Sequence, residues 1–373
     1  MGVCALQESP SREGILVNGA GFGSRFPPLA LRAPQPRRQQ HLVEWVLNFL
    51  FALGKGKEDM ILNIGDKTTQ LLLSLVKTPL IFYPHYKYHM PLPSVMMIEN
   101  TNHCNAKCVM CPRELLSRKR GFMDLGLFEK IIREVSGQKR QPVTHLHGFG
   151  EPMLDKLLPE RIRIAKAYGI KQTYIVSNAS LLSPERSREI IAAGLDKMKI
   201  SFYGTDEESY NSTMKRLDFR ATLQNIKDFL RIRAEMGRRN PRLIVQYLPN
   251  ETNRARTGEF RALWEPLIDK KAGDCLNIST LHNYGGGRDY NPMGTKIVSV
   301  CYFPWTSMSV LWDGRVVTCC MDSNGLQVLG NLNSQTVEEV WTGAVLKGVR
   351  DDFGKLRYDA YPVCRSCDWV RRR

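Results

Sequence analysis

Between residues 94 and 290, short apolar segments alternate with longer segments of helical periodicity. The apolar segments are rich in β-branched and aromatic residues, which favours strands. We predict strands at Ser94–Thr101, Val143–Phe149, Gln172–Asn178, Lys197–Tyr203, Leu243–Pro249 and Cys275–His282. We predict helices between them at Leu125–Val135, Pro159–Tyr168, Pro184–Ala193, Arg220–Glu235 and Thr257–Ile268. Repeated strand–helix units predict an α/β fold, a partial (β/α)6 TIM-type barrel whose site lies at the carboxyl ends of the strands.

The residues before this region follow other patterns. Residues 1–40 are rich in Gly, Pro and Arg, which predicts a disordered extension or an over-long start. Residues 41–93 are interpreted as a helical N-terminal segment and linker. Within them, residues 42–53 place Glu44 and Asn48 on one face of an amphipathic helix. We favour packing of its apolar face on the main domain over contact with a membrane surface or a partner protein.

Charge and cysteine content narrow the class of protein. No segment has the roughly 20 consecutive apolar residues of a membrane-spanning helix, so we expect a cytoplasmic protein. In that reducing compartment, ten cysteines indicate metal ligands more than disulfides. The formal net charge of +16 favours anionic ligands without selecting one. Because no RNA-binding appendage is evident, we do not expect nucleic acid as a partner.

Three cysteines, Cys104, Cys108 and Cys111, directly follow the first predicted strand. Three thiolates can hold three irons of a four-iron cluster and leave the fourth iron open to another ligand. A zinc site is the alternative, but zinc knuckles usually pair CxxC elements. The CxxxCxxC spacing is the signature of the radical S-adenosylmethionine (SAM) superfamily, which the chain resembles over residues 94–290. Family members often have an aromatic residue where Met110 stands, so Met110 is a cofactor-binding candidate.

The resemblance implies SAM contacts at the ends of the next strands. The family's Gly-Gly-Glu-Pro-like turn binds the SAM amino group, and the sequence Gly-Phe-Gly-Glu-Pro stands at that place. Glycines let the backbone approach a ligand, and a carboxylate accepts hydrogen bonds from an ammonium. The polar residues that close later strands resemble further contacts, although each could instead cap a helix. The candidates are Gly148, Gly150, Glu151, Pro152, Ser177, Asn178, Ser201 and, more weakly, Gln246.

A second group of cysteines lies near the end of the sequence: Cys301, Cys319, Cys364 and Cys367. Four thiolates complete a cluster, and residues 291–373 resemble the SPASM or twitch extension, which carries auxiliary iron–sulfur clusters. We predict one auxiliary [4Fe-4S] cluster; a structural zinc site is the alternative.

Two further cysteines have no assigned ligand role. Cys320 adjoins Cys319, and both cannot easily point at one cluster if the pair lies on a strand with alternating side chains. We favour Cys319 as the ligand because of its spacing from Gly314, with four residues between them. Cys320 is then buried filler, the alternative ligand or a hydrogen-atom donor to a substrate radical. Cys275 is a weaker candidate for the same donor role, since a lone cysteine is commonly part of the core.

The resemblance implies an enzyme, a radical SAM oxidoreductase. A flavodoxin- or ferredoxin-type reductant supplies one electron, SAM is cleaved, and a 5′-deoxyadenosyl radical abstracts hydrogen from the substrate. We expect oxidation or epimerisation of a sugar-like or other small polar molecule, with the auxiliary cluster as electron acceptor, because no leader-peptide module is evident. One alternative is a maturase that crosslinks or epimerises a ribosomally made peptide. Another is an iron–sulfur electron carrier without radical chemistry.

Overall fold

The computed structural model describes residues 92–138, 141–249, 254–288, 296–297 and 300–372. These residues belong to one compact unit of the chain. The interpretations of residues 1–40 and of the amphipathic segment 42–53 therefore fall outside the described residues. No helix in the described ranges is long and apolar enough to cross a membrane.

Six strands form a parallel array at the predicted positions. They are β1 (Val95–Ile98), β3 (Val143–His145), β4 (Thr173–Ser177), β5 (Lys197–Ser201), β7 (Arg242–Tyr247) and β8 (Cys275–Ile278). Each strand pairs in parallel with the next one in this series. Parallel pairing requires crossover connections, and helices supply them here. The prediction of an α/β, partial-barrel fold is confirmed.

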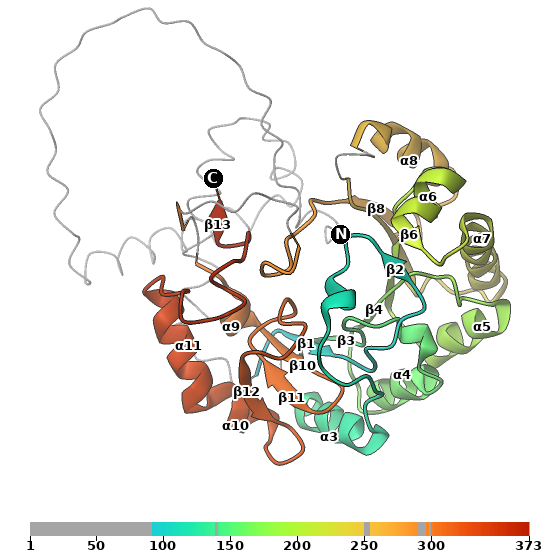
Figure 1. The fold of residues 1–373 in the computed structure, drawn as a ribbon. Helices are drawn as coiled ribbons and strands as arrows, with labels where there is room; N and C mark the ends of the chain where they lie inside the picture. The colour runs from blue at the N-terminus through green and yellow to red at the C-terminus, as the bar shows by residue number, and fades with distance from the viewer. Residues whose placement is uncertain (1–91, 139–140, 250–253, 289–295, 298–299, 373) are drawn as a thin grey trace, which may run out of the picture. The chain divides into compact units, whose positions relative to one another are not determined.

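The crossover helices also lie where helical periodicity predicted them. They are α3 (Leu125–Ser136), α4 (Leu158–Ala167), α5 (Pro184–Ala193), α7 (Phe219–Glu235) and α8 (Thr257–Trp264), with the unpredicted α6 (Glu207–Thr213) between α5 and α7. Figure 1 shows these helices following one another around the outside of the strands. The caps explain the boundaries: the side chains of Asp124, Ser183 and Asp218 each accept a hydrogen bond from a backbone N–H in the first turn.

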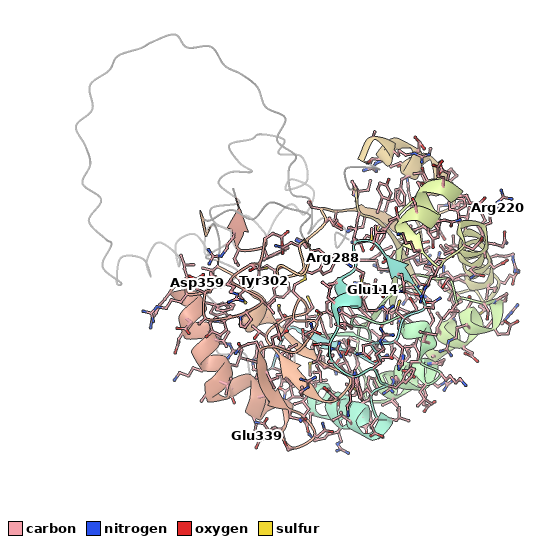
Figure 2. All side chains as sticks on the ribbon, in the orientation of Figure 1. Glu114, Arg220, Arg288, Tyr302, Glu339 and Asp359 are labelled. Carbon is pink, nitrogen blue, oxygen red and sulfur yellow. The ribbon has the colours of Figure 1, made fainter. Side chains whose placement is uncertain are left out.

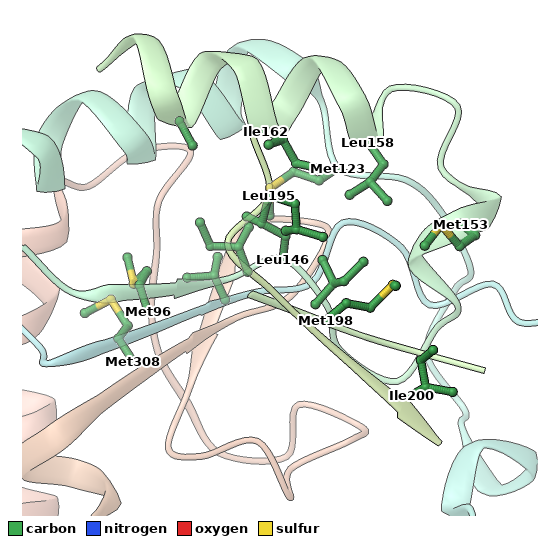
Figure 3. Packing of buried hydrophobic residues seen from close by; sticks show 14 of the residues in the cluster. Met96, Met123, Leu146, Met153, Leu158, Ile162, Leu195, Met198, Ile200 and Met308 are labelled. Carbon is green, nitrogen blue, oxygen red and sulfur yellow. The ribbon is translucent and has the colours of Figure 1, made fainter. Parts of the chain in front are cut away.

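The hydrophobic core lies between these helices and the sheet. Alternate strand residues, including Ile98, Leu146 and Met198, are fully buried. In Figure 3 the strand residues pack against Leu158 and Ile162 of α4. Burying one such side chain stabilises the fold by about 1.5–3 kcal/mol. Because side chains alternate along a strand, the residues between these core positions face the inside of the curved sheet.

The C-terminal region extends the same sheet. Its strands are β10 (Ser307–Val310), β11 (Arg315–Val317) and β12 (Val328–Asn331). Strand β10 pairs in parallel with β1, and β11 and β12 follow as an antiparallel meander. The sheet order is β12-β11-β10-β1-β3-β4-β5-β7-β8, so within the described chain the sheet is open, with β12 and β8 at its edges. Helices α9 (Phe303–Thr306), α10 (Val337–Thr342) and α11 (Ala344–Gly354) complete this region.

Candidate active site

The loop after β1 carries the first three cysteines, and a short strand pair holds its shape. Strand β2 (Lys107–Cys108) pairs with β6 (Met214–Lys215), which places Cys108 opposite Met214. The buried guanidinium of Arg113 donates a 3.0 Å hydrogen bond to the carbonyl of Ala106. The loop is therefore fixed on both sides of Cys108.

The thiols of Cys104, Cys108 and Cys111 are free and lie close enough to influence one another electrostatically. Burial raises the pKa of Cys104 to about 11, and the nearby Cys111 adds to that rise. Burial also raises the pKa of Cys108, and Cys111 and then Cys104 raise it further. Thiols must lose their protons to bind metal, and nearby iron offsets the repulsion between thiolates. This donor set fits an iron–sulfur cluster.

The described ranges contain no group of three or more His, Cys, Asp or Glu side chains that could hold a single metal ion. In a four-iron cluster each cysteine binds a different iron, so a shared ion is not required.

The turn after β3 packs directly on this cysteine loop. A Cβ on Gly150 would lie 2.2 Å from the carbonyl oxygen of Thr101, and one on Gly148 would lie 2.6 Å from Cγ of Glu99. The backbone N–H of Glu151 donates to the carbonyl of His103 at 2.8 Å. We expected these glycines to admit a ligand. In the structure they allow two protein segments to make close contact, and their approach to a ligand stays a prediction.

A Gly150→Ala variant should misplace the cysteine loop, because the carbonyl of Thr101 is backbone and cannot rotate away from the added methyl group. We expect a lower melting temperature and less iron bound after reconstitution. Gly137→Ala is the matched control, since an added Cβ there meets nothing within 4 Å. Equal iron content in the two variants would contradict the proposed packing role.

The buried carboxylate of Glu151 joins the turn to the end of β4. It accepts hydrogen bonds from the N–H of Met153 at 3.0 Å, the hydroxyl of Ser177 at 2.7 Å and the N–H of Asn178 at 2.8 Å. Burial raises the pKa of Glu151, and these three donors oppose the rise. A carboxylate has about four acceptor positions. About one therefore remains for an ammonium group such as that of SAM.

The side chain of Asn178 is also engaged with protein. Its Nδ2 donates to Oδ1 of Asn105 at 3.0 Å, and its Oδ1 accepts from the backbone N–H and the hydroxyl of Ser180 at 3.0 and 2.7 Å. Asn105 directly follows Cys104, so this network connects β4 to the cysteine loop. Pro152 begins the short 3-10 helix η3 (Pro152–Leu154) of the same turn.

The remaining candidates lie in different surroundings. Met110 is almost fully buried in the hydrophobic core. Ser201 pairs in register with Gln246, whose side chain donates to the hydroxyl of Ser279 at 3.0 Å. Cys275 begins β8, whereas Ser201 and Gln246 lie near the carboxyl ends of their strands.

Tyr203 is a residue of this site that we did not predict. Its hydroxyl donates to Oγ of Ser201 at 3.0 Å. Burial raises its pKa well above the ordinary value, and Tyr284, Cys108 and Cys111 add to the rise. Tyr203 is therefore close to the cysteine loop. Its position two residues beyond Ser201, on the same face of the extended chain, was the available signal.

The second group brings together five free thiols: Cys301, Cys319, Cys320, Cys364 and Cys367. Burial raises the pKa of Cys301, and Cys364, Cys367 and Cys320 add to the rise. Cys319 is affected in the same way by Cys320, Cys301 and Cys364. Cys319 and Cys320 lie beyond the end of β11, so strand alternation does not separate the two side chains, and the choice of Cys319 as the ligand stays a prediction.

Residues 281–288 connect the two groups of cysteines. Nδ2 of Asn283 donates to the carbonyl of Ser366, between the last two cysteines, at 2.7 Å. A Cβ on Gly285, which has φ of +67°, would lie 2.4 Å from Val363. Nη2 of Arg288 donates to the carbonyl of Cys111 at 2.8 Å (Figure 2). One segment thus contacts the cysteine loops of both sites.

A buried ion pair makes a second connection. Both carboxylate oxygens of Glu99, at the end of β1, accept hydrogen bonds from Arg118 at 2.6 and 2.7 Å. Nε of Arg118 donates to the carbonyl of Ser323 at 2.6 Å. Glu99 also accepts hydrogen bonds from the N–H groups of Phe149 and Trp312, both at 3.2 Å. The β1 end, the turn after β3 and the C-terminal region therefore meet at one carboxylate.

Comparisons with known proteins agree with this geometry. Residues 98–253 match the model of the radical SAM superfamily, and residues 301–368 match SPASM, an iron–sulfur cluster-binding domain. The second match favours iron–sulfur over zinc at the C-terminal cysteines.

Three similar proteins span most of the chain. The tungsten-containing aldehyde ferredoxin oxidoreductase cofactor-modifying protein of Pyrococcus furiosus is 22% identical over 73% of this chain and 86% of its own. The SAM-dependent 2-deoxy-scyllo-inosamine dehydrogenase of Niallia circulans is 21% identical over 74% and 93%. The crystal structure of Streptococcus suis SuiB bound to precursor peptide SuiA has a TM-score of 0.57 and 14% identity, covering 86% of this chain and 82% of that one.

The described fold, the two groups of cysteines and the two family matches lead to the same assignment. The cofactors that these domains bind are SAM, a [4Fe-4S] cluster and auxiliary iron–sulfur. The chain belongs to the radical SAM superfamily and carries a C-terminal SPASM domain.

Proposed function

We propose that this enzyme oxidises a secondary alcohol of a sugar-like or other small polar molecule to a ketone. Cys104, Cys108 and Cys111 hold the SAM-binding cluster. The auxiliary cluster is held by Cys301, Cys319, Cys364 and Cys367. When bound, the first cluster and SAM would supply the oxidant that removes the carbon-bound hydrogen atom of the substrate. The auxiliary cluster would accept the remaining electron, and the hydroxyl proton would pass to a base or to water.

One observation carries this proposal: residues 281–288 contact the cysteine loops of both sites. A dehydrogenation needs an acceptor for the second electron. A cluster at the C-terminal cysteines, joined to the first site by residues 281–288, would be such an acceptor within the same chain. The similarity to a SAM-dependent dehydrogenase of a cyclic amino alcohol supports this reaction class.

The side chains of the first site perform binding and positioning. Glu151 keeps about one free acceptor position, which suits an ammonium group. Ser201 and Tyr203 form a hydrogen-bonded pair close to Cys108 and Cys111. Phe149 and Tyr284 make an edge contact with ring centroids 6.4 Å apart. We propose that these rings shield the reacting groups from water.

The test compares the wild type with a Cys364→Ala/Cys367→Ala variant. Both are reconstituted anaerobically, reduced and incubated with SAM and a panel of polyols and amino polyols. We expect the wild type to form 5′-deoxyadenosine together with a product lighter by two hydrogen atoms. The variant should still cleave SAM but should form no ketone, because the electron acceptor is missing. Leader-dependent turnover of a ribosomal peptide, with every polyol unchanged, would overturn the proposal.

A further inference from the structure

Four side chains gather on the inner face of the sheet, next to the SAM site: His145, His147, Tyr174 and Lys199, here named the inner cluster. The two imidazole rings stack with centroids 5.3 Å apart. Both rings contact Tyr174, at 4.6 and 5.4 Å between centroids. Nζ of Lys199 lies 6.0 Å from the centre of the tyrosine ring.

Strand register explains why these residues meet. His145 pairs with Tyr174 across β3 and β4, and Val176, two residues further along, pairs with Lys199 across β4 and β5. The residues that alternate with them, such as Leu146 and Met198, are fully buried under the helices. The inner cluster therefore faces the opposite side of the sheet, and its two histidines and Lys199 stay partly accessible.

The inner cluster also borders the SAM site along the chain. His147 directly precedes Gly148, where the turn that carries Glu151 begins. Lys199 lies two residues before Ser201 on β5 and therefore on the same face of the strand.

Within the part of the chain that the structure describes, the ammonium group of Lys199 has no counter-charge. Among the described residues, no carboxylate forms an ion pair with His145, His147 or Lys199. Met97 pairs with His145, and Glu99 lies two residues after Met97. The carboxylate of Glu99, however, already forms an ion pair with Arg118. Nδ1 of each histidine is buried and has no hydrogen-bond partner within the described chain.

The pKa values of Lys199 and the two histidines are all lowered, first by burial. Burial lowers the pKa of Lys199. Burial and then the charge of Lys199 lower the pKa of His147 to about 3, and a hydrogen bond to the backbone of Tyr174 opposes them. Burial lowers the pKa of His145, with further effects from His147, Lys199 and Lys197. An anion placed here would pair with the ammonium and accept hydrogen bonds from imidazole N–H groups.

We propose that the inner cluster binds an anionic oxygen group of the substrate, a phosphate or a carboxylate. This inference rests on the proposed function and narrows its substrate to a phosphorylated or carboxylated alcohol. A core formed only by aromatic packing would not need an ammonium group on its inner face. The carboxylate of SAM is a second source of such a group, and the test separates the two.

The experiment measures anion binding without turnover. Inorganic phosphate and acetate are titrated calorimetrically into the anaerobically reconstituted, SAM-loaded enzyme. We expect Lys199→Met to weaken binding of the preferred anion at least tenfold. Lys199→Arg, which keeps the charge, should retain most of the affinity. Lys227→Met, an exposed position on α7, should bind like the wild type. The affinity for SAM should be equal in all four proteins.

Three results would overturn the proposal. One is that the wild type binds neither anion. Another is that Lys199→Met, with iron content and melting temperature matched to the wild type, binds both anions unchanged. The third is that its affinity for SAM falls tenfold, which would assign the cluster to the carboxylate of SAM. Anion binding as expected, without oxidation of any alcohol in the panel, would contradict only the proposed function.

Discussion

Replacing Cys104, Cys108 and Cys111 together with alanine should lower the iron content from about eight to about four atoms per chain, as expected when one of two four-iron clusters is lost. SAM cleavage should disappear, because no iron with an open coordination position remains at the mouth of the barrel. The measurements are iron and sulfide content, paramagnetic resonance of the reduced protein, and 5′-deoxyadenosine formation.

The matched control removes the other site. Cys364→Ala/Cys367→Ala should also leave about four irons per chain, but SAM should still perturb the spectrum of the remaining cluster. About four irons in the wild type and none in the triple variant would mean that the C-terminal thiols hold no iron. A pure electron carrier would show clusters whose spectra do not respond to SAM.

An Arg118→Met variant should lose about 3–5 kcal/mol of folding free energy, because the buried carboxylate of Glu99 would have no counter-charge. In the folded protein this carboxylate accepts hydrogen bonds from Arg118, Phe149 and Trp312. Denaturant unfolding at matched iron content measures the loss.

Two variants test whether the loss arises from the isolated charge. In Glu99→Gln/Arg118→Met the charge is removed on both sides, so part of the stability should return. Arg220→Met breaks an ion pair with Glu207 at the surface, where the arginine side chain is 82% exposed, and should change little (Figure 2). A single Arg118→Met variant as stable as Arg220→Met would contradict a structural role for the pair.

Local sequence pattern was sufficient to predict the barrel strands and most helices. Each of these elements carries its own signal: Met198 and Ile200 alternate with polar residues, and Ser183 followed by Pro184 begins a helix. The prediction of a metal site at Cys104, Cys108 and Cys111 rests on the same kind of local signal, since the three residues lie within one loop. The superfamily, the fold class and the cofactors were confirmed.

Contacts between distant segments could not be predicted in this way. Glu151 has three protein donors, and two of them, Ser177 and Asn178, lie at the end of β4. Cys319 and Cys320 lie beyond β11 and not on it, so the strand alternation that we considered for this pair does not apply. The inner cluster needed the register of three strands, although the spacing of His145 and His147 already placed both on one face of the predicted strand Val143–Phe149. Register depends on the whole sheet and not on one segment.

The pairing of β1 with β10 limits how early the sheet can be completed while the chain is being synthesised. The ribosome completes β10 more than 200 residues after β1, which takes about 10–40 s at ordinary rates of synthesis. During that interval one edge of β1 has no partner, and Glu99 lacks its contacts with residues beyond 300. Unpaired strand edges invite association with other chains. The strand that leads into the cysteine loop, β1, therefore remains unpaired along one edge until residues 307–310 have been made.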